Sequence, residues 1–206
     1  MTSTYQLKSQ FQSLLRPLAV RLYRAGITAN QITIGACLVS VALGATAIAY
    51  PERNYLFLLI SFWCLLRMAA NALDGMLARE FGQASRLGAV LNEVGDIISD
   101  IALYLPFALV EGSQWGLLVA VILLAVCSEF AGLLGMATGK ERGNHGPMGK
   151  SDRALAFGIL ALLIGCGVSL ASFINALWLT IAALLLLTVF NRGRAAYAAS
   201  INGNIH

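Results

Sequence analysis

Two short series of polar and small residues at helical spacing lie between residues 71 and 100, in an otherwise apolar part of the chain. The first series is separated by three and then four positions: Asn71, Asp74 and Ala78. The second series recurs at every fourth position: Gly88, Asn92, Asp96 and Asp100. Each spacing places its residues on one face of a helix. If the two helices are neighbours, Asp74 can face Asp96 with carboxamides beside them, and such oxygen ligands suit a hard divalent cation.

A structural interpretation of the same residues stays open, because polar side chains commonly make contacts between membrane helices. Two carboxylates, two carboxamides and neighbouring glycines in phase favour a cation site instead. Without a cation, the like charges of Asp74 and Asp96 would repel each other. The pattern therefore predicts a metal site with oxygen ligands from these side chains: Asp74, Asp96, Asn71 and Asn92.

The composition of the chain indicates the environment of these residues. The chain has 206 residues, of which 58% are hydrophobic and 12% are charged, and its mean hydropathy is +0.75. These values are typical of an integral membrane protein, and we expect no nucleic-acid partner. A helix needs about 20 mostly apolar residues to cross a bilayer. Six segments of a single membrane domain, residues 1–206, meet this length: approximately 30–50, 55–78, 87–110, 115–138, 154–172 and 174–192. The predicted fold class is an all-α integral membrane protein with six transmembrane helices.

The segment before the first predicted span, residues 5–25, is amphipathic. Its leucines recur at near-helical spacing, whereas Lys8, Arg16 and Arg24 lie elsewhere around the helix axis. This pattern favours an interfacial helix that lies on an anionic membrane surface. A simple lead-in to the first span is the alternative.

Lys and Arg are distributed unequally between the two sides of the predicted membrane domain. One side carries the basic residues of the N-terminal arm, the second and fourth connections and the C-terminal tail, whereas the other side carries Arg53 alone. Lys and Arg are enriched in cytoplasmic loops. We therefore expect a multi-pass membrane protein with both termini and the two charged connections on the cytoplasmic side.

The polar segment resembles the signature of the CDP-alcohol phosphatidyltransferase family, also called CDP-alcohol phosphotransferases, D-x2-D-G-x2-A-R-x8-G-x3-D-x3-D. Six of the eight fixed positions match it with the same gaps: Asp74, Gly75, Ala78, Arg79, Gly88 and Asp96. The other two positions are Asn71 and Asn92, as in an enterobacterial branch of the family that this chain resembles most. The number of spans, the amphipathic start and the basic fourth connection are also similar to the family.

This resemblance implies an enzyme of phospholipid synthesis that transfers a phosphatidyl group from a CDP-linked lipid, such as CDP-diacylglycerol, to an alcohol and releases CMP. It also implies a place in the bacterial inner membrane, with the active site on the cytoplasmic side. It implies that Asp74 and Asp96 are catalytic, with Asp74 as a ligand of Mg²⁺ or Mn²⁺. Asp96 would be a second ligand or the base that takes the proton of the acceptor hydroxyl. The resemblance also implies a homodimer, and contacts with the donor nucleotide or phosphate at four positions: Gly75, Ala78, Arg79 and Gly88.

The two asparagines lower the negative charge expected at the site. A carboxamide oxygen of Asn71 or Asn92 can ligate a metal, but it cannot neutralise the charge of the metal. We therefore expect one firmly bound ion, with two ions, or recruitment of metal together with substrate, as the alternatives.

Other charged residues extend the candidate site. Basic residues in and after the fourth connection are candidates for binding phosphates of the lipid or the acceptor, although topological charge is the simpler explanation: Lys150, Arg153 and Arg142. Deeper in the membrane, we expect Arg67 to form a buried ion cluster with Asp100 or Glu129. A direct role of these residues in acceptor selection is the alternative.

Two other functions stay open. A non-catalytic membrane protein descended from the enzyme would bind the CDP-lipid and never release CMP. A small ion or solute transporter would use the carboxylates as coupling sites, although the sequence lacks the paired, broken helices of many transporters. The sequence does not specify the acceptor alcohol.

Overall fold

The computed structural model describes residues 3–137, 143 and 145–203. Within these residues the regular structure is entirely helical, and the elements follow one another along the chain: α1 (Ser3–Arg24), α2 (Ala29–Ala49), α3 (Tyr55–Glu80), α4 (Arg86–Tyr104), the 3₁₀ helix η1 (Leu105–Leu109), α5 (Trp115–Ala137), α6 (Lys150–Gly165) and α7 (Ile174–Gly203). The predicted all-α fold class is confirmed.

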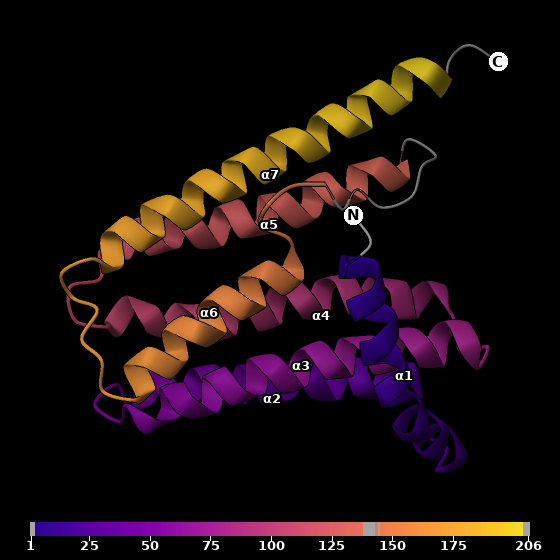
Figure 1. Ribbon diagram of the computed structural model, residues 1–206, viewed down its shortest axis with the longest axis horizontal. Coiled ribbons are helices and arrows are strands. Elements are labelled where there is room, and N and C mark those ends of the chain that lie inside the picture. The colour runs from indigo at the N-terminus through magenta and orange to yellow at the C-terminus, as the bar shows by residue number, and fades with distance from the viewer. Residues whose placement is uncertain (1–2, 138–142, 144, 204–206) are drawn as a thin grey trace.

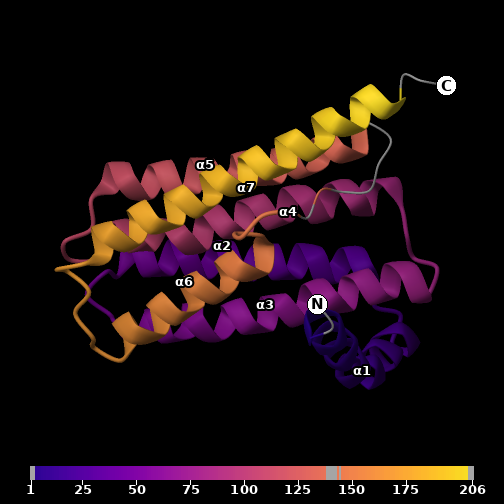
Figure 2. The same ribbon diagram turned by 45° about the horizontal axis from the view of Figure 1, so that its top comes forward.

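The long helices lie roughly along one direction and form a single bundle (Figures 1 and 2). Helix α2 packs against α3 and α4, α6 packs on α3, and α5 pairs with α7. The start of α4 and the ends of α3, α5 and α7 lie at one end of the bundle, and α1 packs on α3 at this end (Figure 1). We call this end the polar end, because the charged residues of the candidate site belong to it.

Side-chain caps fix where the helices of the polar end begin. Thr28 caps α2 by accepting a hydrogen bond from the Gln31 backbone N–H at 3.3 Å, and the Gln31 side chain accepts one from the Thr28 N–H at 2.8 Å. Ser85 caps α4 by accepting a hydrogen bond from the Gly88 N–H at 2.9 Å. Such caps satisfy backbone donors that a helix start leaves unpaired. The Ala29 N–H also donates to Gln83 Oε1 at 2.7 Å, which ties the start of α2 to the connection between α3 and α4.

The predicted spans coincide in position with helices α2 to α7, but not all of these helices qualify as spans by themselves. Four helical segments are long and apolar enough to cross a membrane: Ala29–Ala49, Tyr55–Glu80, Trp115–Met136 and Ile174–Ala198. Helix α4 carries several charged residues, and α6 has only 16 residues. A helix of 16 residues is about 24 Å long, which is less than the roughly 30 Å of a bilayer core.

Helix α6 starts and ends earlier than the predicted span 154–172. The described part of the preceding connection runs against the bundle, because the Met148 N–H donates to the Thr188 hydroxyl of α7 at 3.0 Å and Met148 is buried. Gly146, at φ +120°, lies so close to Thr188 that a side chain there would collide with it. Only a glycine adopts this backbone conformation readily. This return of the chain places Lys150, the first residue of α6, inside the molecule.

Helix α1 rests across the end of α3. Ala19 is fully buried in a small apolar cluster with Leu73 and Met76 of α3, and Arg16 pairs with Glu80 at 2.8 Å. Several large apolar side chains of α1 stay exposed: Phe11, Leu14 and Leu18. A helix is therefore present at the predicted position and exposes apolar side chains, and its place on a membrane surface stays a prediction.

Candidate active site

The two polar faces predicted from helical spacing meet between α3 and α4. Asn71 of α3 donates a hydrogen bond from Nδ2 to Asp96 Oδ1 of α4 at 2.9 Å. Arg67, one turn earlier on α3, donates from Nη2 to the same oxygen at 3.0 Å. The two helices thus present these residues to each other, as the spacing indicated.

Asp74 lies on the same part of α3, next to α2. Its side chain is buried, with the residue 6% exposed, and Oδ2 accepts a hydrogen bond from the Thr33 hydroxyl at 2.8 Å. Within the described part of the chain, no Lys, Arg or His makes an ion pair with Asp74. Asp74 therefore differs from the other buried carboxylates of the bundle.

Asp96 has both carboxylate oxygens engaged. Oδ1 accepts the hydrogen bonds from Arg67 and Asn71, and Oδ2 accepts one from Lys150 Nζ at 2.7 Å. The Lys150 ammonium also lies 3.4 Å from Glu93 Oε2 and 3.8 Å from Glu129 Oε2. The carboxylate of Asp96 is thus held in place from α3 and from the start of α6.

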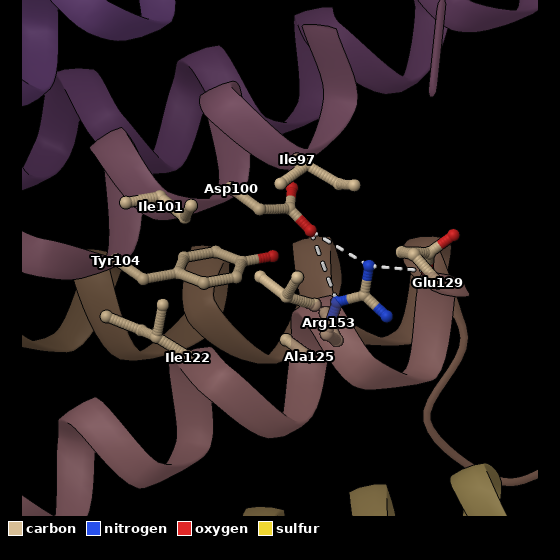
Figure 3. A pocket seen from close by; sticks show the side chains of 9 residues that line it. Ile97, Asp100, Ile101, Tyr104, Ile122, Ala125, Glu129 and Arg153 are labelled. Atoms are coloured by element: carbon tan, nitrogen blue, oxygen red, sulfur yellow. Dashed lines mark hydrogen bonds and ion pairs between the residues drawn. The ribbon is translucent and has the colours of Figure 1, made fainter. Parts of the chain in front are cut away.

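A buried ion cluster extends from Asp96 toward the interior of the bundle. Arg67 pairs with Asp100, so that the predicted pair is confirmed. Arg153 of α6 is 1% exposed and bridges Asp100 Oδ2, at 2.9 Å, and Glu129 Oε1, at 2.8 Å (Figure 3). Glu129 of α5 therefore pairs with Arg153 and not, in the described contacts, with Arg67. Buried charges of this kind are stable only when each is paired and hydrogen-bonded.

Sequence reasoning missed residues that other helices bring to this cluster. Arg192 of α7 was interpreted as topological charge, yet it is buried, donates to the Ser128 carbonyl at 2.6 Å and lies 3.6 Å from Glu129. Ser128 accepts a hydrogen bond from Arg153 at 3.2 Å. Thr33 reaches Asp74 from α2. The spacing of Thr188 and Arg192 by four positions was an available signal for a polar face on α7.

The predicted donor-contact positions lie around the end of α3 and the start of α4. A Cβ atom at Gly75 would lie 2.8 Å from the Arg79 guanidinium. The glycine therefore leaves space for the Arg79 side chain. Arg79 itself is exposed, and Ala78 is half-buried. A side chain at Gly88 would approach Asn30 Oδ1 of α2 to 2.6 Å. Gly88 thus permits the close contact between α4 and α2.

Of the remaining candidates, Asn92 is half-buried on α4, one turn before Asp96. Lys150 and Arg153 both contact carboxylates, as described above. Arg142 lies outside the described residues.

The donor atoms near Asp74 fit one hard cation. Among the residues that the structure describes, no group of three His, Cys, Asp or Glu side chains could hold a metal by itself. Asp74 is a buried carboxylate without a described ion pair, and the carboxamide of Asn71 lies one turn before it on the same helix. Mg²⁺ typically takes one or two carboxylates and completes its shell with water and substrate phosphates. Asp96, whose oxygens are already engaged, is less suited to a second ion.

Comparisons with known proteins give this arrangement a family. A family model described as CDP-alcohol phosphatidyltransferase matches residues 26–190. The chain is 45% identical over 196 residues to the inner membrane protein YnbA of Escherichia coli (strain K12), covering 95% of this chain and 97% of that protein. It is 31% identical over 172 residues to the phosphatidylinositol phosphate synthase of Mycobacterium marinum, covering 81% and 70% of the two chains.

A solved structure has the same fold. The crystal structure of Mycobacterium tuberculosis phosphatidylinositol phosphate synthase (PgsA1) in complex with manganese and citrate matches with a TM-score of 0.66 and 24% identity, covering 88% of each chain. The predicted resemblance to the family, and to an enterobacterial branch of it, is confirmed. The chain therefore belongs to the CDP-alcohol phosphatidyltransferase family and is a bacterial inner-membrane enzyme of phospholipid synthesis.

Proposed function

We propose that this enzyme transfers a phosphatidyl group from a CDP-diacylglycerol-like lipid to an alcohol and releases CMP at the polar end of the bundle. The observation that carries the proposal is a pair of buried carboxylates at this end, Asp74 of α3 and Asp96 of α4, because Asp96 is hydrogen-bonded to Asn71, one turn before Asp74 on α3. Buried carboxylates are costly in a membrane and are usually functional.

Asp74 and Asp96 have different roles in this proposal. Asp74, together with the carboxamide oxygens of Asn71 and Asn92, would hold one Mg²⁺ or Mn²⁺. When bound, such an ion offsets the negative charge of the donor diphosphate and of the departing CMP. Asp96 is oriented by Arg67 and Asn71 and accepts the proton of the acceptor hydroxyl, which makes the hydroxyl oxygen a better nucleophile. The oxygen then attacks the phosphorus next to the lipid, and the bond to CMP breaks.

The phosphates of the substrates need cationic partners. Arg79 is exposed one turn or so from Asp74 and suits the donor diphosphate, while Gly75, Ala78 and Gly88 leave room for the nucleotide. The Lys150 side chain is 24% exposed and can be reached by a phosphate. Arg153 is almost completely buried among carboxylates, so its role is to position Asp100 and Glu129. Arg142 remains a candidate for phosphate binding.

The membrane arrangement is part of the same proposal. The described helices α2 to α7 cross the membrane as six segments, with the charged faces of α4 and α6 covered by their neighbours, and α1 lies on the cytoplasmic surface through its exposed apolar residues. Both termini and the active site face the cytoplasm, where the Lys and Arg residues are concentrated. The functional unit is a homodimer, and the basic surroundings favour a phosphorylated alcohol.

The test is CMP release by the purified protein in lipid nanodiscs with CDP-diacylglycerol, Mg²⁺ or Mn²⁺, and a panel of alcohols that includes glycerol phosphate, inositol phosphate and serine. We expect release with at least one acceptor and a loss of about 10²- to 10⁴-fold in Asp96→Asn. Glu111→Gln, a change of an exposed carboxylate at the opposite end of the bundle, is the matched control and should retain activity.

Two outcomes would overturn this function in favour of the alternatives. Binding of CDP-diacylglycerol without CMP release by any acceptor would support a lipid-binding protein, which the two asparagines in place of aspartate would explain. Ion or solute flux in proteoliposomes without CMP release would support a transporter.

A further inference from the structure

Lys150 lies in a pocket made by three carboxylates. Its Nζ is 2.7 Å from Asp96 Oδ2 and 3.4 Å from Glu93 Oε2, both on α4, and 3.8 Å from Glu129 Oε2 on α5. The Lys150 side chain is only 24% exposed, and the side chain of Glu129 is 2% exposed. The Lys150 ammonium thus stands where carboxylate oxygens of two helices converge.

The backbone fixes this lysine in its place. The Gly149 N–H donates to Asp152 Oδ2 at 2.9 Å, which caps the start of α6, and the Met148 N–H is bound to Thr188 of α7. Lys150 is the first residue of the helix. Because the chain before Lys150 is hydrogen-bonded to α7 and the start of α6 is capped, the backbone holds its ammonium in the site.

The ion pairs of the buried carboxylates show which position is still open to a cation. Asp96, Asp100 and Glu129 each have an Arg or Lys nitrogen within 4.0 Å. Asp74 has no such partner among the described residues. A divalent ion such as Mg²⁺ binds an oxygen at about 2.0–2.1 Å, so an ion on Asp96 Oδ2 would compete directly with an ammonium that lies 2.7 Å from the same atom.

We propose that the Lys150 ammonium is a built-in cation of the active site, which occupies the position between Glu93, Asp96 and Glu129. The protein then takes one divalent ion, at Asp74, and removal of the ammonium opens a second ion position at Asp96. This inference rests on the proposed metal site at Asp74. It also explains why Asn71 and Asn92 can replace the aspartates of the family signature. A site with one divalent ion and one ammonium needs fewer negative charges than a site with two divalent ions.

The experiment is a titration of the purified, full-length protein with Mn²⁺ alone, without donor lipid, followed by the electron paramagnetic resonance signal of free Mn²⁺ and by calorimetry. We expect one site per chain in the wild type, two in Lys150→Met, and one again in the double variant Lys150→Met/Asp96→Asn. Arg86→Gln is the matched control, since it removes an exposed positive charge at the start of α4 and should leave one site.

Several results would overturn the proposal: two sites in the wild type, one unchanged site in Lys150→Met, or no site in either protein. Circular dichroism shows whether each variant is folded, and Lys150→Gln is a second variant for the case that Lys150→Met does not fold. The wild-type stoichiometry tests the proposal even if both variants fail to fold. Because Mn²⁺ is counted without substrate, a protein that binds one ion and releases no CMP would contradict the proposed function and not this inference.

Discussion

The two ends of the helical bundle are built by different physical means. At the polar end, charged side chains from α3, α4, α5, α6 and α7 neutralise one another in a buried network. In the other half, aromatic rings do the packing: Phe107 of η1 contacts Phe57, Phe157 and Trp178 with ring centroids 5.2, 5.3 and 6.0 Å apart. A pocket of about 350 Å³, open to the surface, lies at that end beside Phe57 and Leu170.

From this difference we infer in which part of the bundle a substitution can change stability without changing catalysis. A network of ion pairs sets the orientation and the protonation state of its side chains as well as their position. A substitution in the network should therefore alter both catalysis and folding. An aromatic core fixes position alone, so a change in it should alter folding and leave the chemistry of the folded protein intact. The following predictions test this contrast in order of expected effect.

The largest effect should come from Asp74→Asn, which removes the one buried carboxylate that has no described cationic partner. We expect CMP release to fall by about 10²-fold or more, because the proposed ion is no longer held. Thermal stability should change little or rise, since an unpaired buried charge is removed. Steady-state rates and melting temperature measured on the same preparation check this. Unchanged activity would remove Asp74 from the site.

Arg153→Met should cost about 3–5 kcal/mol of stability, because Asp100 and Glu129 would lose a shared, deeply buried partner. Chemical unfolding in detergent micelles measures this change. Arg86→Gln, at an exposed position, provides the comparison and should shift stability by less than about 0.5 kcal/mol. Equal stability of the two variants would show that the network is dispensable.

Phe107→Ala should cost a similar amount, about 3–5 kcal/mol, through the lost burial and the cavity that it leaves. Unlike Arg153→Met, it should leave the KM for the donor lipid unchanged, since Phe107 belongs to the aromatic half. Kinetics at a temperature where both variants are folded separate the two cases. A large change in KM would show that the two halves are coupled.

Thr33→Val should have a smaller effect confined to the metal. Loss of the hydroxyl that donates to Asp74 Oδ2 should weaken Mn²⁺ binding by about 10- to 100-fold, because residues that orient a ligand contribute to metal affinity at this level. Calorimetric titration measures the affinity. Thr46→Val, whose hydroxyl bonds only to the backbone of its own helix, should bind Mn²⁺ like the wild type.

Arg16→Gln should have the smallest effect on stability, below about 1 kcal/mol, because its pair with Glu80 is largely exposed to solvent. Melting curves at low and high salt measure this, and any loss should disappear at high salt. If the stability loss of Arg16→Gln persists at high salt, Arg16 stabilises the contact between α1 and α3 by more than its charge.

Helical periodicity explains which parts of this structure could be predicted. Asn71 and Asp96 meet because residues three or four apart share a helix face, and the same reasoning paired Arg67 with Asp100. Lys150 could not be placed in this way, since its position depends on a connection that turns back against α7 through Met148 and Thr188.

Contacts between distant helices set the rest of the site. Arg192 is 63 residues after Glu129 along the chain, by the difference of their numbers, and nothing in the local pattern of α7 indicates that partner. Thr33 likewise reaches Asp74 only because α2 packs against α3. The match to the family signature identifies residues of α3 and α4. Side chains that pair with them, such as Lys150 and Thr33, come from other helices.

Gly44 influences the geometry of the candidate active site, although this residue lies far from Asp74. The backbone of α2 touches the Ala102 carbonyl of α4 at this residue so closely that no side chain fits. The contact acts as a pivot: any larger residue would tilt α2 outward, and the displacement would grow over the roughly three turns that separate Gly44 from Thr33. The position of the hydroxyl that orients Asp74 therefore depends, in part, on the absence of a side chain at Gly44, near the other end of α2.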